Sequence, residues 1–185
     1  MAFFGPSEYD AVRARWLRFL STMWSRPWSR PNRPCTTELD NLVDHVAYEV
    51  AALEASAERF SKVNLWVYLE VFLLHARLLR EFFWGKRRAT DVSARDYCDS
   101  WREKNQPPTV KATKIPIDKQ LAHITKDRVN PKVTMDLGAH VAPLRDELRA
   151  AWKRFIGQLA SDPRATKFDA ALRKKCAELG VPPPP

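Results

Sequence analysis

The sequence predicts an all-α protein, a single helical bundle of about five or six helices with a long basic connection between the third and fourth helices. Hydrophobic residues make up 45% of the 185 positions, and most recur every three or four residues, the spacing of amphipathic helices. Only five glycines are present, which argues against a turn-rich sandwich or barrel. A chain of this length buries enough surface to fold as one domain.

Residues 1–35 are expected to form a first helix and a connector rich in Pro and Arg. Ser7 and Asp10 have the spacing of a helix start, and apolar residues then recur at helical spacing up to Trp24. Three prolines in residues 25–35 exclude a helix interior, so this stretch should be extended.

Residues 36–180 are expected to form the bundle, beginning with a second helix that Thr36 or Thr37 caps and that reaches Phe60. Its apolar residues follow three- and four-residue steps, which predicts one buried face. These residues are Leu39, Leu42, Val43, Val46, Val50, Leu53, Ala57 and Phe60.

A third helix is predicted from a cap at Ser61 to Trp84, with Gly85 as a left-handed stop. It is the most apolar helix of the chain, so it should be the central element of the core. Its predicted buried arc contains Leu65, Tyr68, Leu69, Phe72, Ala76, Leu79 and Phe83.

The connection from Lys86 to Ile115 shows no sustained periodicity and is unusually long for a compact domain. Tyr97 and Trp101 could anchor its middle on the bundle by burying aromatic surface. Residues 86–135 hold twelve Lys and Arg against six Asp and Glu, a net charge of +6, which would attract a polyanion.

Three further helices are predicted, over residues 116–130, 137–159 and 164–179. Proline suits the first turn of a helix, so Pro116 is taken as the start of the first of these. Residues 181–185 should form an extended polyproline tail after the last helix.

The cysteines and the hydropathy exclude several classes of protein. Cys35, Cys98 and Cys176 are far apart and have no metal-ligand or redox spacing, so we expect reduced thiols, no metal and no cofactor. No uncharged apolar run of 18 residues occurs, and no signal peptide is apparent, which predicts a cytoplasmic protein that does not span a membrane.

His75 lies on the flank of the apolar arc of the third helix, where a polar ring requires a partner. The favoured interpretation is a core histidine with a hydrogen bond from another helix, and the alternative is a group that faces a binding cleft. Arg77 would point to the other side of the helix, so the two would act together only with a second subunit.

His123 is the better candidate for chemistry. Lys119, His123 and Lys126 share one predicted helix face, where two ammonium groups and an imidazole suit phosphate. Such a face could support metal-free RNA cleavage, with His123 as acid or base and Lys119 or Arg128 stabilising phosphoryl charge. Asp127, four residues from His123, would instead make this a surface ion cluster.

The string Leu121-Ala122-His123, late in a helix that packs with a long apolar one, resembles the signature region of the HEPN (higher eukaryotes and prokaryotes nucleotide-binding) superfamily. The resemblance covers residues 60–130 and implies an all-α bundle, a dimer, and metal-independent ribonuclease activity in toxin-antitoxin or phage-defence systems. The family motif has an Arg, then four to six intervening residues, then the His, and at the required positions this chain has Pro116, Ile117 and Asp118. Without that Arg the resemblance implies the fold more than the reaction.

Three functions therefore remain open. The favoured one is an HEPN-like module that binds a protein, such as an antitoxin, or RNA without catalysis, because an acid at position 118 would repel phosphate. The second is a ribonuclease that uses His123. The third is a basic nucleic-acid-binding protein that uses residues 86–135 with Tyr97 and Trp101.

Overall fold

The computed structural model describes residues 34–85, 91–101, 105–121 and 136–185. The chain divides into two compact units, residues 1–32 with 87–91 and residues 33–86 with 92–185. Nearly all of the first unit lies outside the described residues, including the predicted helix up to Trp24. Every helix of the described residues belongs to the second unit.

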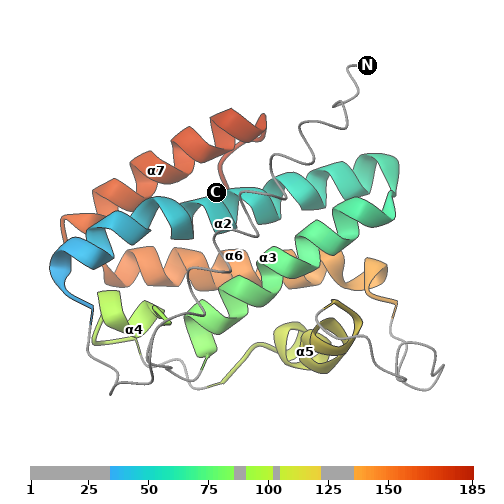
Figure 1. The fold of residues 1–185 in the computed structure, drawn as a ribbon, viewed down its shortest axis with the longest axis horizontal. Helices are drawn as coiled ribbons and strands as arrows, with labels where there is room; N and C mark the ends of the chain where they lie inside the picture. The colour runs from blue at the N-terminus through green and yellow to red at the C-terminus, as the bar shows by residue number, and fades with distance from the viewer. Residues whose placement is uncertain (1–33, 86–90, 102–104, 122–135) are drawn as a thin grey trace, which may run out of the picture. The chain divides into compact units, whose positions relative to one another are not determined.

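The described residues are helical and include no strand, which confirms the predicted all-α bundle of five or six helices (Figure 1). A 3-10 turn, η2 (Gly138–His140), leads into α6 (Val141–Gln158). The helices are α2 (Thr36–Val63), α3 (Trp66–Trp84), α4 (Ala94–Tyr97), α5 (Pro108–Leu121), α6 (Val141–Gln158) and α7 (Arg164–Leu179).

The core lies where α2, α3, α6 and α7 meet, and α2 packs extensively against both α3 and α7. Eight consecutive residues of α2, Val50–Ala57, are buried, so this part of the helix is enclosed around its whole circumference. The third helix, predicted as the central element, packs against α2, α4, α5 and α6, and α2 packs against α3, α6 and α7, so these two helices share the centre of the core.

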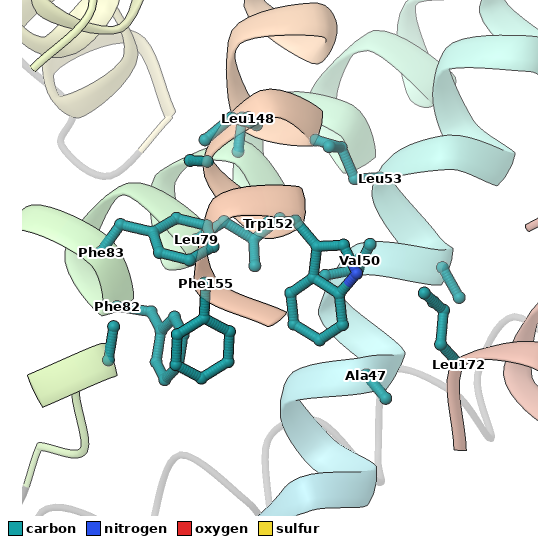
Figure 2. Packing of buried hydrophobic residues seen from close by; sticks show 14 of the residues in the cluster. Ala47, Val50, Leu53, Leu79, Phe82, Phe83, Leu148, Trp152, Phe155 and Leu172 are labelled. Carbon is teal, nitrogen blue, oxygen red and sulfur yellow. The ribbon is translucent and has the colours of Figure 1, made fainter. Parts of the chain in front are cut away.

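Aromatic rings from α3 and α6 pack together in the core (Figure 2). The ring of Phe155 on α6 packs edge to face on Phe82 of α3, with centroids 5.4 Å apart. The ring of Phe168 on α7 also packs on the Phe155 ring, with centroids 5.5 Å apart. Burying each ring contributes about 2–3 kcal/mol to the hydrophobic stabilisation.

The start of α2 differs by one residue from the prediction. The cap is Cys35 instead of Thr36 or Thr37, and its backbone N–H donates to the Glu38 carboxylate at 3.0 Å. The acid in the first turn thus satisfies the N–H of the capping residue itself, whereas a threonine hydroxyl was expected to accept from N–H groups within the first turn.

The turn between α2 and α3 also differs, because α2 continues past Ser61 to Val63. The Ser61 hydroxyl donates back to the Glu58 carbonyl at 2.7 Å and does not cap a helix. Asn64 ends α2 in the left-handed conformation, with φ 48°, which asparagine tolerates better than most residues.

Gly85 ends α3 as predicted, but in an extended conformation with φ −63° and not in the left-handed one. Its requirement for glycine is steric. A Cβ at this position would lie 2.3 Å from the Glu81 carbonyl oxygen, closer than any atoms in van der Waals contact.

The connection after α3 is anchored as the sequence predicts. The Tyr97 hydroxyl donates to the Leu39 carbonyl at 3.0 Å, and the Trp101 indole N–H donates to the Phe83 carbonyl at 2.9 Å. Both rings are buried. The short helix α4 begins at a capping box in which Ser93 and Asp96 bond each other.

The helix α5 begins eight residues before the predicted start, and Pro116 lies inside it. Its first N–H groups, those of Thr109 and Val110, donate to the Glu147 carboxylate of α6 at 3.0 and 2.8 Å. This carboxylate thus satisfies two backbone donors in the first turn of the helix. The described part ends at Leu121, so the rest of the predicted helix to residue 130 lies outside the described residues.

The last two helices follow the prediction closely. Within the predicted range 137–159, residues Gly138–His140 form the 3-10 turn and α6 follows. The helix α7 spans Arg164–Leu179 as predicted, and Gly180 ends it at φ 70°. None of the described helices combines the length and apolar character needed to cross a bilayer.

Candidate functional site

The predicted catalytic histidine and two of its three cationic neighbours lie outside the described residues. These are His123, Lys126 and Arg128. Lys119, the third, lies half-buried near the end of α5.

Arg77, a predicted binding residue, contacts α5 through Asp118. Its Nε lies 3.1 Å from Asp118 Oδ1, and Nη2 of the buried Arg80 lies 2.9 Å from the same oxygen. Arg80 also bonds Glu81 at 2.8 Å. The acid that was expected to repel phosphate is thus neutralised by two guanidinium groups, and this cluster joins α3 to α5.

His75 has the hydrogen-bond partner on another helix that a core histidine requires. Its Nδ1 lies 2.6 Å from Glu49 Oε2 of α2, and its ring packs edge to face on Tyr48 at 5.7 Å. The ring is buried, which confirms the structural interpretation. The partner of Arg77 is on α5, so the structure does not bring His75 and Arg77 into one site.

Tyr97 and Trp101 are part of the core and present no ring face on which a base could stack. The Arg164 guanidinium lies over the Tyr97 ring, 5.5 Å from its centroid. Burial raises the pKa of the Tyr97 phenol well above its usual value, with a smaller opposing effect of Arg164. Their role in the structure is therefore to anchor the connection after α3 on the bundle.

The described residues offer no metal centre and no reactive thiol pair. No group of three or more His, Cys, Asp and Glu among them is placed to hold a metal ion. Cys35 is exposed, whereas Cys98 and Cys176 are buried, and all three are free. Burial, with a contribution from Glu54, raises the pKa of the Cys176 thiol, which favours the unreactive protonated form.

An exposed apolar surface lies at the turn between α2 and α3. Six large hydrophobic side chains among the described residues are exposed, and five of them lie within nine positions of the sequence. We call these five the corner patch. They are Val63 (51% exposed), Leu65 (54%), Trp66 (59%), Val67 (36%) and Val71 (37%).

Local structure explains why the side chains next to the turn reach solvent. Asn64 turns the chain between two helices that are separated by only two residues, so the residues beside it cannot reach the core. The polar atom of the Trp66 ring, Nε1, donates to Glu70 Oε1 at 2.7 Å. What the ring offers to a partner is therefore its apolar faces.

The rim of the corner patch carries charge of both signs. Lys62 pairs with Glu58 one turn earlier at 2.6 Å, and Glu70 lies beyond Trp66 on α3. This surface was not predicted, and Leu65 was expected in the buried arc. The three consecutive apolar residues Leu65, Trp66 and Val67 were a usable signal, because one helix face cannot bury all three.

A small hollow lies between α2 and α7. Its lining includes Asp40, Asp44, Lys167 and Lys174. The Lys167 ammonium lies 2.7 Å from Asp40 Oδ2, so charges of opposite sign already meet across it. Its lining holds no nucleophile paired with a base.

Comparisons with family models, with curated proteins and with solved structures each find no match for this chain. We therefore infer its function from its own sequence and geometry.

Proposed function

We propose that this chain is a non-catalytic helical module that acts by binding a protein on the corner patch. The observation that carries the proposal is the exposure of five large apolar side chains at one turn of an otherwise well-packed bundle. Apolar patches of this kind, rimmed by polar residues, commonly mark protein interaction sites. Trp66, the largest and most exposed residue of this patch, belongs to a residue type that is enriched among those that dominate binding energy.

The charges around the patch favour a protein over RNA or an anionic bilayer. Both of those ligands require clustered Lys and Arg. The rim instead has the acids Glu58 and Glu70 with one base, Lys62.

The positions of the other candidate residues support binding without catalysis. The His75 ring is hydrogen-bonded to Glu49, and the guanidinium groups of Arg77 and Arg80 form ion pairs with Asp118. The ribonuclease activity of His123 and the relationship to the HEPN superfamily stay predictions. We expect purified full-length protein to leave a range of RNA substrates intact, and cleavage that His123→Ala abolishes would contradict the proposal.

A photoreactive amino acid at Val67 tests the proposed binding surface. In cells, this position should form an adduct with a protein, and the same amino acid at Ile115 should not. Ile115 is a matched control because it is the sixth exposed apolar residue and lies on α5. The adduct partner, identified by mass spectrometry, should bind the purified chain, and Trp66→Ala should abolish both adduct and binding. Adducts with RNA alone, or equal adducts at both positions, would contradict the proposal.

A further inference from the structure

We propose that residues 181–185, Val-Pro-Pro-Pro-Pro, are a docking segment for a protein that has an aromatic, proline-binding groove. We call these residues the proline segment. The inference goes beyond the proposed function, because the segment is a second site and its chemistry differs from that of the corner patch.

The composition of the proline segment determines its conformation. Each proline ring holds φ near −65° and disfavours the α conformation for the residue before it. Four prolines in succession therefore favour a polyproline II helix, which has three residues per turn and no internal hydrogen bonds. In the structure these residues follow α7 and belong to neither a helix nor a strand (Figure 1). The backbone carbonyl groups of such a segment are left to accept hydrogen bonds from a partner.

The exposure of the proline segment follows this period of three. Val181 and Pro184 are half-buried, whereas Pro182, Pro183 and Pro185 are exposed. Residues three apart lie on one edge of a polyproline II helix. The edge with Val181 and Pro184 therefore faces the protein, and Val181 packs against the core. The other two edges face solvent, and Pro182 and Pro185 share one of them.

The base of the proline segment is held in place. Gly180 ends α7 at φ 70°, and the Val181 N–H donates to the Cys176 carbonyl at 3.0 Å, the longer bond of a Schellman motif. The Arg59 guanidinium of α2 donates to the Leu179 carbonyl at 3.1 Å. A stiff segment on a fixed base loses little conformational entropy when it binds.

These features identify the class of partner. Grooves that bind polyproline II segments are lined with aromatic side chains and recognise prolines at positions i and i+3. Pro182 and Pro185 have this spacing on a free edge of the segment. The five residues carry no charged side chain, whereas RNA and anionic bilayers attract clustered Lys and Arg. The chemistry of the segment therefore matches a protein groove.

Titration of the whole chain with three purified proline-binding domains, of the WW, SH3 and EVH1 types, tests the inference. At least one domain should bind, and chemical-shift changes in the isotope-labelled domain should map to its aromatic groove. A proline-rich peptide that occupies the same groove should displace the chain. Binding by none of the three domains, or binding outside the groove, would contradict the inference.

Single alanine substitutions test which edge is read. Pro182→Ala and Pro185→Ala should each raise the dissociation constant about tenfold, because each removes a ring that enters the groove. Pro184→Ala is the matched control. It also removes one proline, but from the edge that faces the protein, and should change the constant less than about twofold. Equal losses at positions 182 and 184 would contradict the assigned edge. All three positions lie outside the helices, so the urea unfolding midpoint should not change.

A synthetic peptide of residues 178–185 tests whether the segment is accessible in the folded chain. The folded chain should bind the domain at least as tightly as the peptide, because two edges of its segment are free and its base is fixed. A domain that binds the peptide but not the folded chain would contradict the inference, since the bundle would then block the groove.

The outcomes separate this inference from the proposed function. Trp66→Ala should leave the affinity for the proline-binding domain unchanged, and Pro182→Ala should leave the adduct at position 67 unchanged. A chain that forms the adduct but binds none of the domains keeps the proposed function and contradicts this inference. A chain that binds a domain through Pro182 and Pro185 but forms no adduct supports this inference and contradicts the proposed function.

Discussion

Replacing Arg149 with methionine should strongly destabilise the bundle, because it leaves a carboxylate in the core without its partner. Glu54 on α2 is 4% exposed, and the Arg149 guanidinium of α6 binds it with two hydrogen bonds, one of them 2.6 Å long from Nε to Oε1. These hydrogen bonds raise the pKa of Arg149. Breaking one side of a buried ion pair costs about 3–5 kcal/mol. Because the Arg149 side chain is 29% exposed, water reaches the pair. We therefore expect Arg149→Met to lower the free energy of unfolding by about 2–3 kcal/mol.

Urea unfolding at pH 7, followed by circular dichroism at 222 nm, measures this loss. The double variant Glu54→Met with Arg149→Met should recover to within about 1 kcal/mol of the original chain, because neither a charge nor an unpartnered polar group remains buried at this position. Arg173→Met is the matched control. It breaks an equally direct pair with Asp169 on the surface of α7 and should have no measurable effect. A loss below about 1 kcal/mol for Arg149→Met, or a double variant as unstable as the single one, would show that the buried carboxylate does not depend on this partner.

Three further changes test other contacts. Burial raises the pKa of the Tyr97 phenol above its usual 10.0, so its contribution is complete below pH 10 and falls as pH rises above it. Tyr97→Phe should lose about 1 kcal/mol at pH 7 with the hydrogen bond to Leu39, yet its stability should fall less steeply in alkaline urea titrations. Gly85→Ala should cost about 2 kcal/mol through its clash with the Glu81 carbonyl oxygen. Gly157→Ala, with open space around it in α6, should gain about 0.5–1 kcal/mol. In thermal unfolding, a midpoint that does not fall for Gly85→Ala contradicts the first expectation, and one that falls for Gly157→Ala contradicts the second. Glu49→Ala should cost about 1–2 kcal/mol because the buried His75 ring loses its partner, and an unchanged urea midpoint would show that the ring finds another.

The elements that the sequence predicted well are those whose signals are local. In α7, Phe168, Leu172 and Cys176 recur every four residues, and all three are buried. Gly180 supplies the left-handed residue that ends the helix. The spacing of the apolar residues and the glycine that ends the helix both lie in this segment of the sequence, so together they predicted the bounds of α7.

The start of α5 was not predictable in this way, because its stabilising group is distant in sequence. Glu147 lies 38 residues after Thr109, whose N–H it accepts. Local rules instead favoured Pro116 as the first residue, since proline is common there. In the structure Pro116 lies inside the helix, and tertiary contact decides the boundary.

The candidate site shows the same division between local and tertiary information. The sequence predicted that His75 needs a partner on another helix, but it could not identify Glu49 as that partner. It also placed Tyr97 and Trp101 as anchors and as possible base-stacking groups. Their burial supports the first role and removes their faces from solvent in the described structure.

The predicted buried arc missed the corner patch, because the spacing of apolar residues does not show which of them a neighbouring helix covers. Leu65 shares an arc with buried residues of α3, but it precedes the first residue of the helix, and Asn64 turns the chain just before it. More than half of the surface of Val63, Leu65 and Trp66 stays in water, so these side chains contribute little to the folding of one chain. Removing them should therefore change association far more than stability. Residues such as Phe155, which is fully buried, should show the opposite behaviour, and this contrast separates an interaction surface from a core.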